Sequence, residues 1–366
     1  MPPLPRPHLP GAGRRAIVVG AGSFGTAVAV LLARAGLRTT LQARTASQAE
    51  ELTASRQNAI YLPGVELPRE LRIEAIDEGL GRGDFVFLAV PSRGLDEVLA
   101  GLAERELGRR AAVISLAKGL VPPDGVAPTV LLSASLGAKR VACVGGPAHA
   151  QEMVGDGAGL VAASTDERLA HTLAQIFNRA GVVCEQSEDP VGVELAGAAK
   201  NAAALAVGAT EAQGLNAAGA AAGHIFAEVW HFAVLQGAQP ESLIGLAGTG
   251  DLVATALAPT SRNHRAGALL AEGVPAAEIP VRIGQAVEAL ESVPLLARAL
   301  ERAGVGAPVT SALGALIAGE LPVDEWVARV RTTVPAPARF RRPRPGFWRR
   351  SWARVRGVDS RRRRLS

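Results

Sequence analysis

The first half of the chain alternates between short apolar runs and longer stretches of helical composition. The apolar runs show no clear period of two, which is typical of strands buried on both faces of a parallel sheet. Between the first two runs, residues 26–34 are long enough for a helix, and Gly36 is placed to end it. The predicted strands cover residues 16–19, 39–43, 85–90, 111–116, 141–144, 160–163 and 182–184.

The pattern changes after Ser187-Glu-Asp-Pro190, because no convincing strand follows. The fold class predicted is α/β: a Rossmann-like, doubly wound, mostly parallel sheet at residues 14–189, then an all-helical domain at residues 190–330. The cleft between these two parts is the expected place for a site. The predicted helices of the second part cover residues 191–207, 218–236, 261–272, 283–290 and 294–303.

The two ends differ in composition from the rest. Residues 1–13 are rich in proline and are predicted to form a disordered arm. Residues 331–366 hold thirteen arginines and one acid, a net charge of +12 in a chain of +5, so residues 1–330 carry −7. A solvated, disordered extension is the favoured interpretation of this Arg-rich tail. Contact with nucleic acid or anionic lipid, as an accessory property, is the alternative left open.

Composition argues against several classes of protein. No apolar run reaches the roughly eighteen residues of a membrane helix, and the first residues lack the apolar core of a signal peptide. Cys143 and Cys184 form no Cys-x-x-Cys pair, and histidines are few, which argues against a disulfide framework or a zinc site. We therefore expect a cytoplasmic protein without a bound metal.

A glycine motif directly follows the first predicted strand and opens the first predicted helix. In this context glycines let the backbone approach a pyrophosphate closely, while the amides of the helix start face the anion. We therefore predict a dinucleotide site. Its predicted residues are Gly20, Gly22, Ser23, Phe24 and Gly25.

The end of the second predicted strand bears on the choice of cofactor. An NAD site usually places an acid there to hold the ribose 2′-hydroxyl. Here the strand ends in Leu41-Gln-Ala-Arg44, without an acid. Arg44 can meet a 2′-phosphate, so NADP is the favoured cofactor and NAD the alternative. An ordinary exposed arginine is the competing interpretation of Arg44.

Lys200 and Asn201 lie in an alanine-rich stretch predicted to be helical. A lysine is costly to bury in such a helix without a task. When a nicotinamide transfers hydride, an ammonium can stabilise the carbonyl oxygen and donate a proton, and a neutral lysine can accept one in reverse. We therefore predict Lys200 as the catalytic residue. A surface lysine with a buried stem is the alternative.

Further motifs follow in order, and the most specific are Gly245-Leu-Ala-Gly-Thr-Gly-Asp-Leu252 and Ser261-Arg-Asn263. With the glycine motif and Lys200-Asn201, they resemble the bacterial NAD(P)-dependent glycerol-3-phosphate dehydrogenases, within the superfamily similar to 6-phosphogluconate dehydrogenase. The resemblance runs from about residue 16 to about residue 320. The other motifs that carry it are Phe87-Leu-Ala-Val-Pro-Ser92, Ser115-Leu-Ala-Lys-Gly119 and Gly145-Gly-Pro-Ala-His-Ala150.

The resemblance implies reduction of dihydroxyacetone phosphate to sn-glycerol 3-phosphate for glycerophospholipid synthesis, the reverse reaction, and a homodimer as a candidate assembly. It also implies roles for individual residues. The implied substrate contacts are Lys118, Gly146, Ala148, Lys200, Asn201, Asp251, Ser261, Arg262 and Asn263. The implied cofactor contacts beyond the glycine motif are Arg44, Lys118, Ala150, Arg262 and Val281.

Three of these roles have competing interpretations. Asp251 is expected to orient the ammonium of Lys200, with Thr255 one turn later on the same face, but an N-cap role is the alternative. Ser261 and Arg262 open a predicted helix, which suits a phosphate clamp. A capping serine followed by an exposed arginine is the alternative there. For Lys118, the alternative is a simple loop lysine.

The chain also departs from the family pattern. Ile283, directly before Gly284, stands where the family usually has a cofactor-contacting glutamate. His224 and Ile225 replace an Arg-Gly pair before Glu228, and Ala148 and His149 replace Ser-Phe. Two other functions therefore stay open: a sister NADP-dependent hydroxy-acid or sugar-phosphate dehydrogenase, and a non-catalytic NADP-binding regulator. The Ser261-Arg-Asn263 motif speaks against the first, and the retained lysines speak against the second.

Overall fold

The computed structural model describes residues 13–76, 79–80, 83–258 and 261–334. Most of the predicted arm and tail therefore lie outside the described residues. Within the described part, no helix is both long and apolar enough to cross a membrane.

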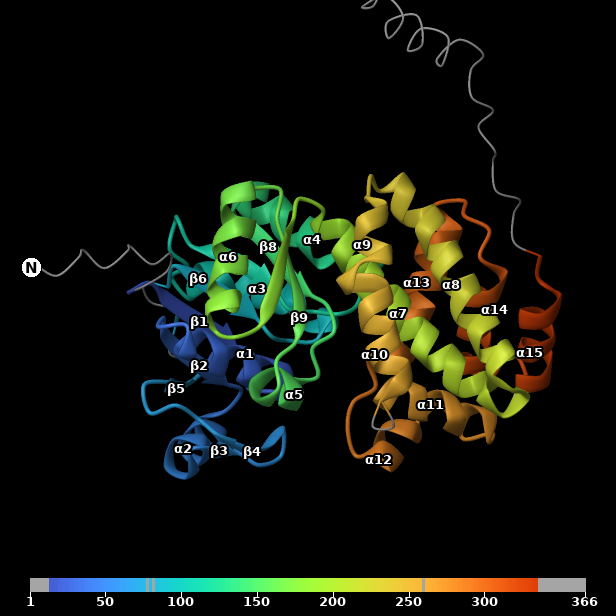
Figure 1. Cartoon of the computed structure of the whole chain (residues 1–366), viewed down its shortest axis with the longest axis horizontal. Coiled ribbons are helices and arrows are strands. Elements are labelled where there is room, and N and C mark those ends of the chain that lie inside the picture. Colours follow the sequence, from blue (N-terminus) through green and yellow to red (C-terminus); the bar gives the residue numbers. More distant parts are fainter. Residues whose placement is uncertain (1–12, 77–78, 81–82, 259–260, 335–366) are drawn as a thin grey trace, which may run out of the picture. The chain divides into compact units, whose positions relative to one another are not determined.

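An eight-stranded sheet organises the first half of the chain (Figure 1). Its strand order is β10-β9-β8-β7-β6-β1-β2-β5, and every neighbouring pair is parallel except β8 with β9. The chain builds outward from β1 through β2 to β5 and then crosses to β6, so the order reverses between β1 and β6. The strands are β1 (Arg15–Val19), β2 (Arg38–Ala43), β5 (Arg72–Ala75), β6 (Phe85–Leu88), β7 (Ala112–Ser115), β8 (Val141–Gly145), β9 (Gly159–Ala163) and β10 (Val183–Ser187).

The strands are buried because both faces of the sheet are covered. Ala16 and Val18 of β1 belong to an apolar cluster with α1 and α6, whereas Ile17 and Val19 belong to another with α3 and α4. This explains the apolar runs without alternation. The prediction of a doubly wound, mostly parallel sheet is confirmed. The helices of this half are α1 (Ser23–Arg34), α2 (Ala46–Ser55), α3 (Leu95–Glu104), α4 (Pro128–Leu136), α5 (Ala150–Gly155) and α6 (Glu167–Arg179).

After β10 the described chain is helical (Figure 1). The long helix α7 (Pro190–Thr210) lies at its centre and packs against α8 (Leu215–Leu235) and α11 (Arg262–Ala271). A Cβ on Gly208 would lie 2.0 Å from the carbonyl oxygen of His264, and one on Gly267 would lie 2.0 Å from that of Leu205. The backbones of α7 and α11 thus touch, which brings their polar side chains together.

The remaining helices surround α7. They are α9 (Pro240–Ile244), the π-helical turn η5 (Leu246–Gly250), α10 (Asp251–Leu257), α12 (Ile279–Ile283), α13 (Glu288–Arg302), α14 (Pro308–Ala318) and α15 (Val323–Thr332).

Some predicted elements differ from the observed ones. The helix predicted at residues 283–290 is wrong, because Gly284 adopts a left-handed conformation (φ 77°) that ends α12, and a new helix starts at Glu288. That helix, α13, begins six residues before the predicted one and contains Pro294 in its interior. The short strands β3 (Gln57–Asn58), β4 (Leu62–Glu66) and β5, and several short helices, were not predicted. Helix α15 also includes the first two residues assigned to the tail.

Candidate active site

The glycine motif forms a tight loop between β1 and α1. Gly20 has a φ of 110°, and a Cβ there would lie 2.5 Å from the carbonyl oxygen of Ala89, just after β6. A Cβ on Gly25 would lie 2.1 Å from the oxygen of Gly20, whereas one on Gly22 would meet nothing within 4 Å. No side chain caps the start of α1. The loop is therefore closed toward the protein and open at Gly22, which fits the pyrophosphate of a dinucleotide.

Arg44 lies beside this loop. It directly follows β2, whose Gln42 carbonyl accepts a hydrogen bond from the amide of Gly20 at 2.9 Å. The Arg44 side chain is exposed, and its guanidinium has no hydrogen bond or ion pair in the described part of the chain. The Gln42 side chain donates a hydrogen bond to the carbonyl of Gly79. The role of Arg44 toward a 2′-phosphate, and with it the preference for NADP over NAD, stays a prediction.

Lys200 is buried in α7, with 6% of its surface exposed. Its Nζ lies 3.3 Å from Oδ2 of Asp251 and donates a hydrogen bond to Oγ1 of Thr255 at 3.3 Å. The Thr255 hydroxyl in turn lies 3.3 Å from Oδ1 of Asp251. Lys200 is thus held in the interior by a carboxylate and a hydroxyl, rather than lying on the surface.

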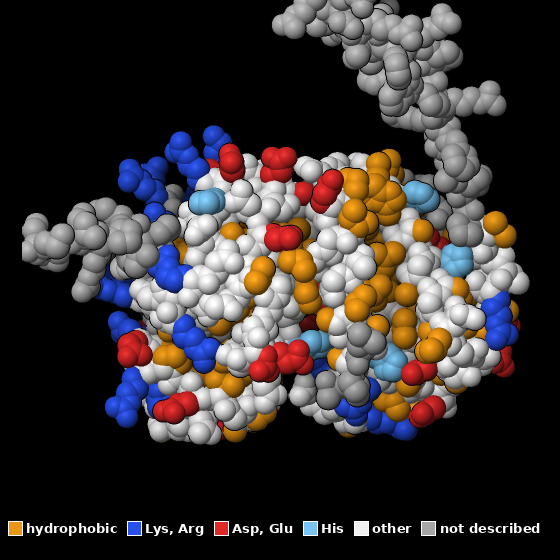
Figure 2. Space-filling view, in the orientation of Figure 1, with side chains coloured by type: hydrophobic (Ala, Val, Ile, Leu, Met, Phe, Trp, Pro, Cys, Tyr) orange, Lys and Arg blue, Asp and Glu red, His pale blue; other side chains and the backbone are white. Residues whose placement is uncertain are grey.

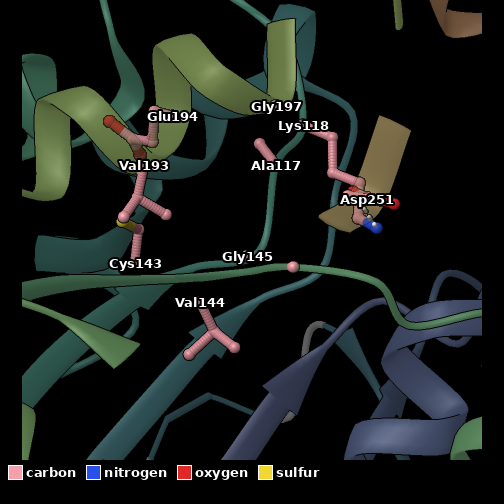
Figure 3. A pocket seen from close by; sticks show the side chains of 10 residues that line it. Ala117, Lys118, Cys143, Val144, Gly145, Val193, Glu194, Gly197 and Asp251 are labelled. Carbon is pink, nitrogen blue, oxygen red and sulfur yellow. Dashed lines mark ion pairs between the residues drawn. The ribbon is translucent and has the colours of Figure 1, made fainter. Parts of the chain in front are cut away.

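Lys118 approaches the same carboxylate from the loop after β7. Its Nζ lies 3.7 Å from Oδ2 of Asp251, and Figure 3 shows the two side chains pointing toward each other. Its ammonium also lies over the ring of Phe24, 4.9 Å from the centroid. Lys118 therefore connects the glycine loop of the sheet half with Asp251 of the helical half.

The neighbouring charges and burial shift the pKa values of Lys200 and Asp251. Burial lowers the pKa of Lys200, and the charge of Lys118 lowers it further, while Asp251 and Glu288 oppose the change. Burial alone would raise the pKa of Asp251, but the charges of Lys118 and Lys200 outweigh it and lower that pKa. The result is an ionised carboxylate beside a lysine whose proton is easier to remove than in water.

Lysine is rare in this chain. The sequence contains 36 arginines but only three lysines, and two of them meet at Asp251. Arginine cannot lose its proton in a protein, whereas a buried lysine can. The residue type thus agrees with a proton-transferring role.

Asp251 is the first residue of α10 and has helical backbone angles (φ −69°, ψ −31°). Its carboxylate faces the lysines and makes no capping hydrogen bond to the helix start. The geometry therefore agrees with an orienting role, and the alternative of an N-cap is wrong.

The loop after β8 lines a pocket beside Lys118 and Asp251. Gly146 has a φ of 112°, and a Cβ there would lie 2.5 Å from the carbonyl oxygen of Gly159. The pocket is lined by this glycine together with Ala117, Lys118, Glu194 and Asp251 (Figure 3). Ala148 is buried in the loop and Ala150 begins α5. Their contacts with substrate and cofactor stay predictions.

The two asparagines expected to contact substrate are joined to each other. Asn201 donates hydrogen bonds to the carbonyl of Lys118 at 3.0 Å and to Oε2 of Glu288 at 3.2 Å. Its Oδ1 accepts from Nδ2 of Asn263 at 2.9 Å, and Oδ1 of Asn263 accepts from the amide of Ala289 at 3.3 Å. In this structure both side chains hold protein elements together, so a substrate contact stays a prediction.

The start of α11 matches the alternative interpretation of Ser261 and Arg262. Ser261 caps the helix by accepting from the amide of His264 at 3.3 Å. Arg262 is exposed and donates to the carbonyl of Ala286 at 2.9 Å. Val281 is 83% exposed on α12. The contacts of Arg262 and Val281 with ligands stay predictions.

Sequence reasoning missed two acidic residues of the site. Glu288 contacts Asn201, and buried Glu194 accepts from the amide and hydroxyl of Thr129 at the start of α4. Burial raises the pKa of Glu194 to about 8, although hydrogen bonds from Thr129 and Ser115 oppose the shift. Only the apolar surroundings of Glu194 in the sequence hint at its burial. No group of three or more His, Cys, Asp or Glu side chains in the described ranges is arranged to hold a metal.

A doubly wound sheet with an open glycine loop, and a buried lysine on the helix that follows it, together define a nicotinamide-dependent dehydrogenase. Two family models agree: the NAD-dependent glycerol-3-phosphate dehydrogenase N-terminus matches residues 15–170, and the C-terminus matches residues 189–328. The chain belongs to the NAD-dependent glycerol-3-phosphate dehydrogenase family.

Individual proteins support this assignment. The chain is 40% identical to glycerol-3-phosphate dehydrogenase [NAD(P)+] of Deinococcus radiodurans, over 85% of this chain and 92% of that protein. It is 37% identical to the Streptomyces coelicolor enzyme of the same name, over 84% and 94%. The crystal structure of glycerol-3-phosphate dehydrogenase from Coxiella burnetii is similar with a TM-score of 0.82 and 27% identity, over 88% of this chain and 99% of that one.

Proposed function

We propose that this chain reduces dihydroxyacetone phosphate to sn-glycerol 3-phosphate with NADPH as the preferred cofactor, and catalyses the reverse oxidation. The observation that carries the proposal is the buried Lys200, paired with Asp251 and accompanied by Lys118, in a chain whose glycine loop fits a dinucleotide. The product would supply glycerophospholipid synthesis. A sister hydroxy-acid dehydrogenase and a non-catalytic regulator are not favoured by any observation on the site.

A dihydronicotinamide, once bound at the glycine loop, would supply the hydride that the ketone carbon needs. As negative charge develops on the ketone oxygen, the ammonium of Lys200 stabilises it and donates a proton. Asp251 holds that ammonium in place, and burial makes its proton easier to give up. In the reverse direction, neutral Lys200 accepts the proton of the hydroxyl.

Lys118 and the start of α11 would recognise the rest of the substrate. Lys118 has both a charge partner and an aromatic platform, which fixes its ammonium for a substrate oxygen. Arg262, exposed at the helix start, can form a charge-assisted bond to a phosphate. Arg44 would meet the 2′-phosphate of NADP.

The decisive experiment follows the absorbance of reduced nicotinamide with dihydroxyacetone phosphate and either NADPH or NADH. Lys200→Ala should lower kcat by a factor on the order of 10² to 10⁴. The matched control is Lys139→Ala, which removes the third lysine, an exposed one. Equal rates for Lys200→Ala and wild type would remove the catalytic assignment. Absence of turnover by the wild type with both nucleotides would remove the proposed function.

A homodimer also stays a proposal. Figure 2 shows apolar side chains gathered over the region of α8 and α9, where Leu235 and Ile244 are 62% and 72% exposed. Monomers rarely leave such side chains uncovered in a group. Light scattering gives the mass in solution, and Ile244→Asp should shift it toward the monomer if this face is the interface.

A further inference from the structure

Glu288 is the first residue of α13, and it closes a ring of hydrogen bonds next to the two site lysines. Its Oε2 accepts from Nδ2 of Asn201 at 3.2 Å. Asn201 accepts from Asn263 at 2.9 Å, and Asn263 accepts at 3.3 Å from the amide of Ala289, the neighbour of Glu288. The ring therefore connects α7, α11 and the start of α13.

The same amide reaches the loop of Lys118. Nδ2 of Asn201 has two hydrogens, and its two acceptors are the carbonyl of Lys118 at 3.0 Å and the carboxylate of Glu288. Asn201 is 1% exposed, so in the intact protein these two acceptors, rather than solvent, satisfy its amide. Without Glu288, the Asn201 amide would keep only one of these two protein acceptors. Its orientation would then be less fixed, and its hydrogen bond to the carbonyl of Lys118 would weaken.

Glu288 also contributes charge. Lys200 is close to the positive charge of Lys118 and to the negative charges of Asp251 and Glu288. His149 lies within electrostatic range of Asp251. Glu288 supports the protonated form of Lys200, against burial and against Lys118. Unlike Asp251, it is exposed. A carboxylate in that position acts on Lys200 with little cost of desolvation to itself.

We propose that Glu288 is a positioning residue for the reaction: it fixes the side chain of Asn201, and through it the backbone of Lys118, so that Lys118 stays aligned on the substrate beside Lys200. This inference rests on the proposed function. It assigns to Glu288 a role through its neighbours, without contact to the reacting atoms.

The test compares three variants of the full chain. Glu288→Ala removes the acceptor and the charge, whereas Glu288→Gln removes the charge and keeps an oxygen for Asn201. Glu291→Ala is the matched control, since Glu291 lies in the same first turn of α13 but pairs with Arg93. Nucleotide affinity by fluorescence titration and the melting temperature verify that each variant is folded.

Glu288→Ala is expected to lower kcat/KM for dihydroxyacetone phosphate about tenfold to hundredfold, the range for a small misplacement of catalytic groups, with unchanged nucleotide affinity. Glu288→Gln should stay within about threefold at neutral pH by keeping the acceptor. It should also move the alkaline limb of the pH–rate profile for reduction to lower pH, because the protonated form of Lys200 loses a supporting charge.

A double-mutant cycle shows whether Glu288 acts through Asn201. In an Asn201→Ala background, Glu288→Ala should have little further effect. Three outcomes would overturn the inference. The first is full additivity of the losses in kcat/KM from Glu288→Ala and Asn201→Ala. The others are equal losses in kcat/KM for Glu288→Gln and Glu288→Ala, or a kcat/KM of Glu288→Ala equal to that of Glu291→Ala. If Glu288→Ala fails to fold, Glu288→Leu takes its place under the same criteria. Loss of turnover in the wild type itself would instead count against the proposed function.

Discussion

The glycine loop and the lysine centre are built in opposite ways. The loop consists of six consecutive residues, and its shape follows from backbone contacts that leave no space for a Cβ at Gly20 or Gly25. The lysine centre takes one or two side chains from each of several elements, α7, α10, α11, α13 and the loop after β7. A site made of backbone is encoded locally and excludes a Cβ at its close-packed positions, here Gly20 and Gly25. A site made of side chains depends on how distant helices pack, and it can be tuned one residue at a time.

The largest effect should come from removing the carboxylate shared by the lysines. Asp251→Asn leaves two ammonium groups close together without the carboxylate that they share, and the pKa of Lys200 falls further although Glu288 still opposes the change. We expect kcat for reduction to fall by about 10² or more, while NADPH affinity changes little because the glycine loop is untouched. Stopped-flow reduction and nucleotide titration measure the two quantities. If Asp251→Asn lowers both kcat and NADPH affinity, the lysine centre and the glycine loop are not independent.

The converse change breaks the loop and spares the lysines. Gly25→Ala places a Cβ 2.1 Å from the oxygen of Gly20, so the loop must shift, and NADPH affinity should fall at least about tenfold. Gly155→Ala is the control, because that helical glycine has open space around it. An affinity for NADPH equal to wild type in Gly25→Ala would contradict the close-packed loop.

A smaller effect is expected at the edge of the loop. Arg44→Ala should weaken NADPH binding by about tenfold and leave NADH binding unchanged, because only NADPH carries the 2′-phosphate. The measurement is the ratio of the dissociation constants for NADPH and NADH in each variant. If Arg44→Ala leaves this ratio unchanged, Arg44 is an ordinary exposed arginine, and no residue explains the preference for NADP.

The last prediction concerns stability. Because burial raises the pKa of Glu194 to about 8, the folded state favours the protonated form. This contribution to the free energy of unfolding is present below the ordinary carboxyl pKa of about 4.3 and is lost as pH rises toward 8. Glu194→Gln, which imitates the protonated form, should therefore gain stability relative to wild type between pH 5 and pH 8, on the order of 1 kcal/mol or more. Urea denaturation across that range, with exposed Glu241→Gln as the control, measures the difference.

These contrasts explain what the sequence could predict. The glycine loop, the buried strands and the split after β10 depend on neighbouring residues, so local patterns revealed them. The ring around Asn201 could not be predicted, because its partners lie 62 to 87 residues away and meet only where α7 and α11 cross. The helix predicted at residues 283–290 was wrong for a related reason. Its apolar pattern is continuous, but the left-handed Gly284 divides it.

The scarcity of lysine has a practical consequence. Lys139 follows α4 on the surface, whereas Lys118 and Lys200 are partly or fully enclosed. Among the three lysine side chains, amine-selective reagents should therefore modify Lys139 first, which offers an anchoring point for immobilisation or a dye. Bound substrate should slow the modification of Lys118 and Lys200. The rate of that modification would then report how much of the site is occupied by substrate, independent of any turnover assay.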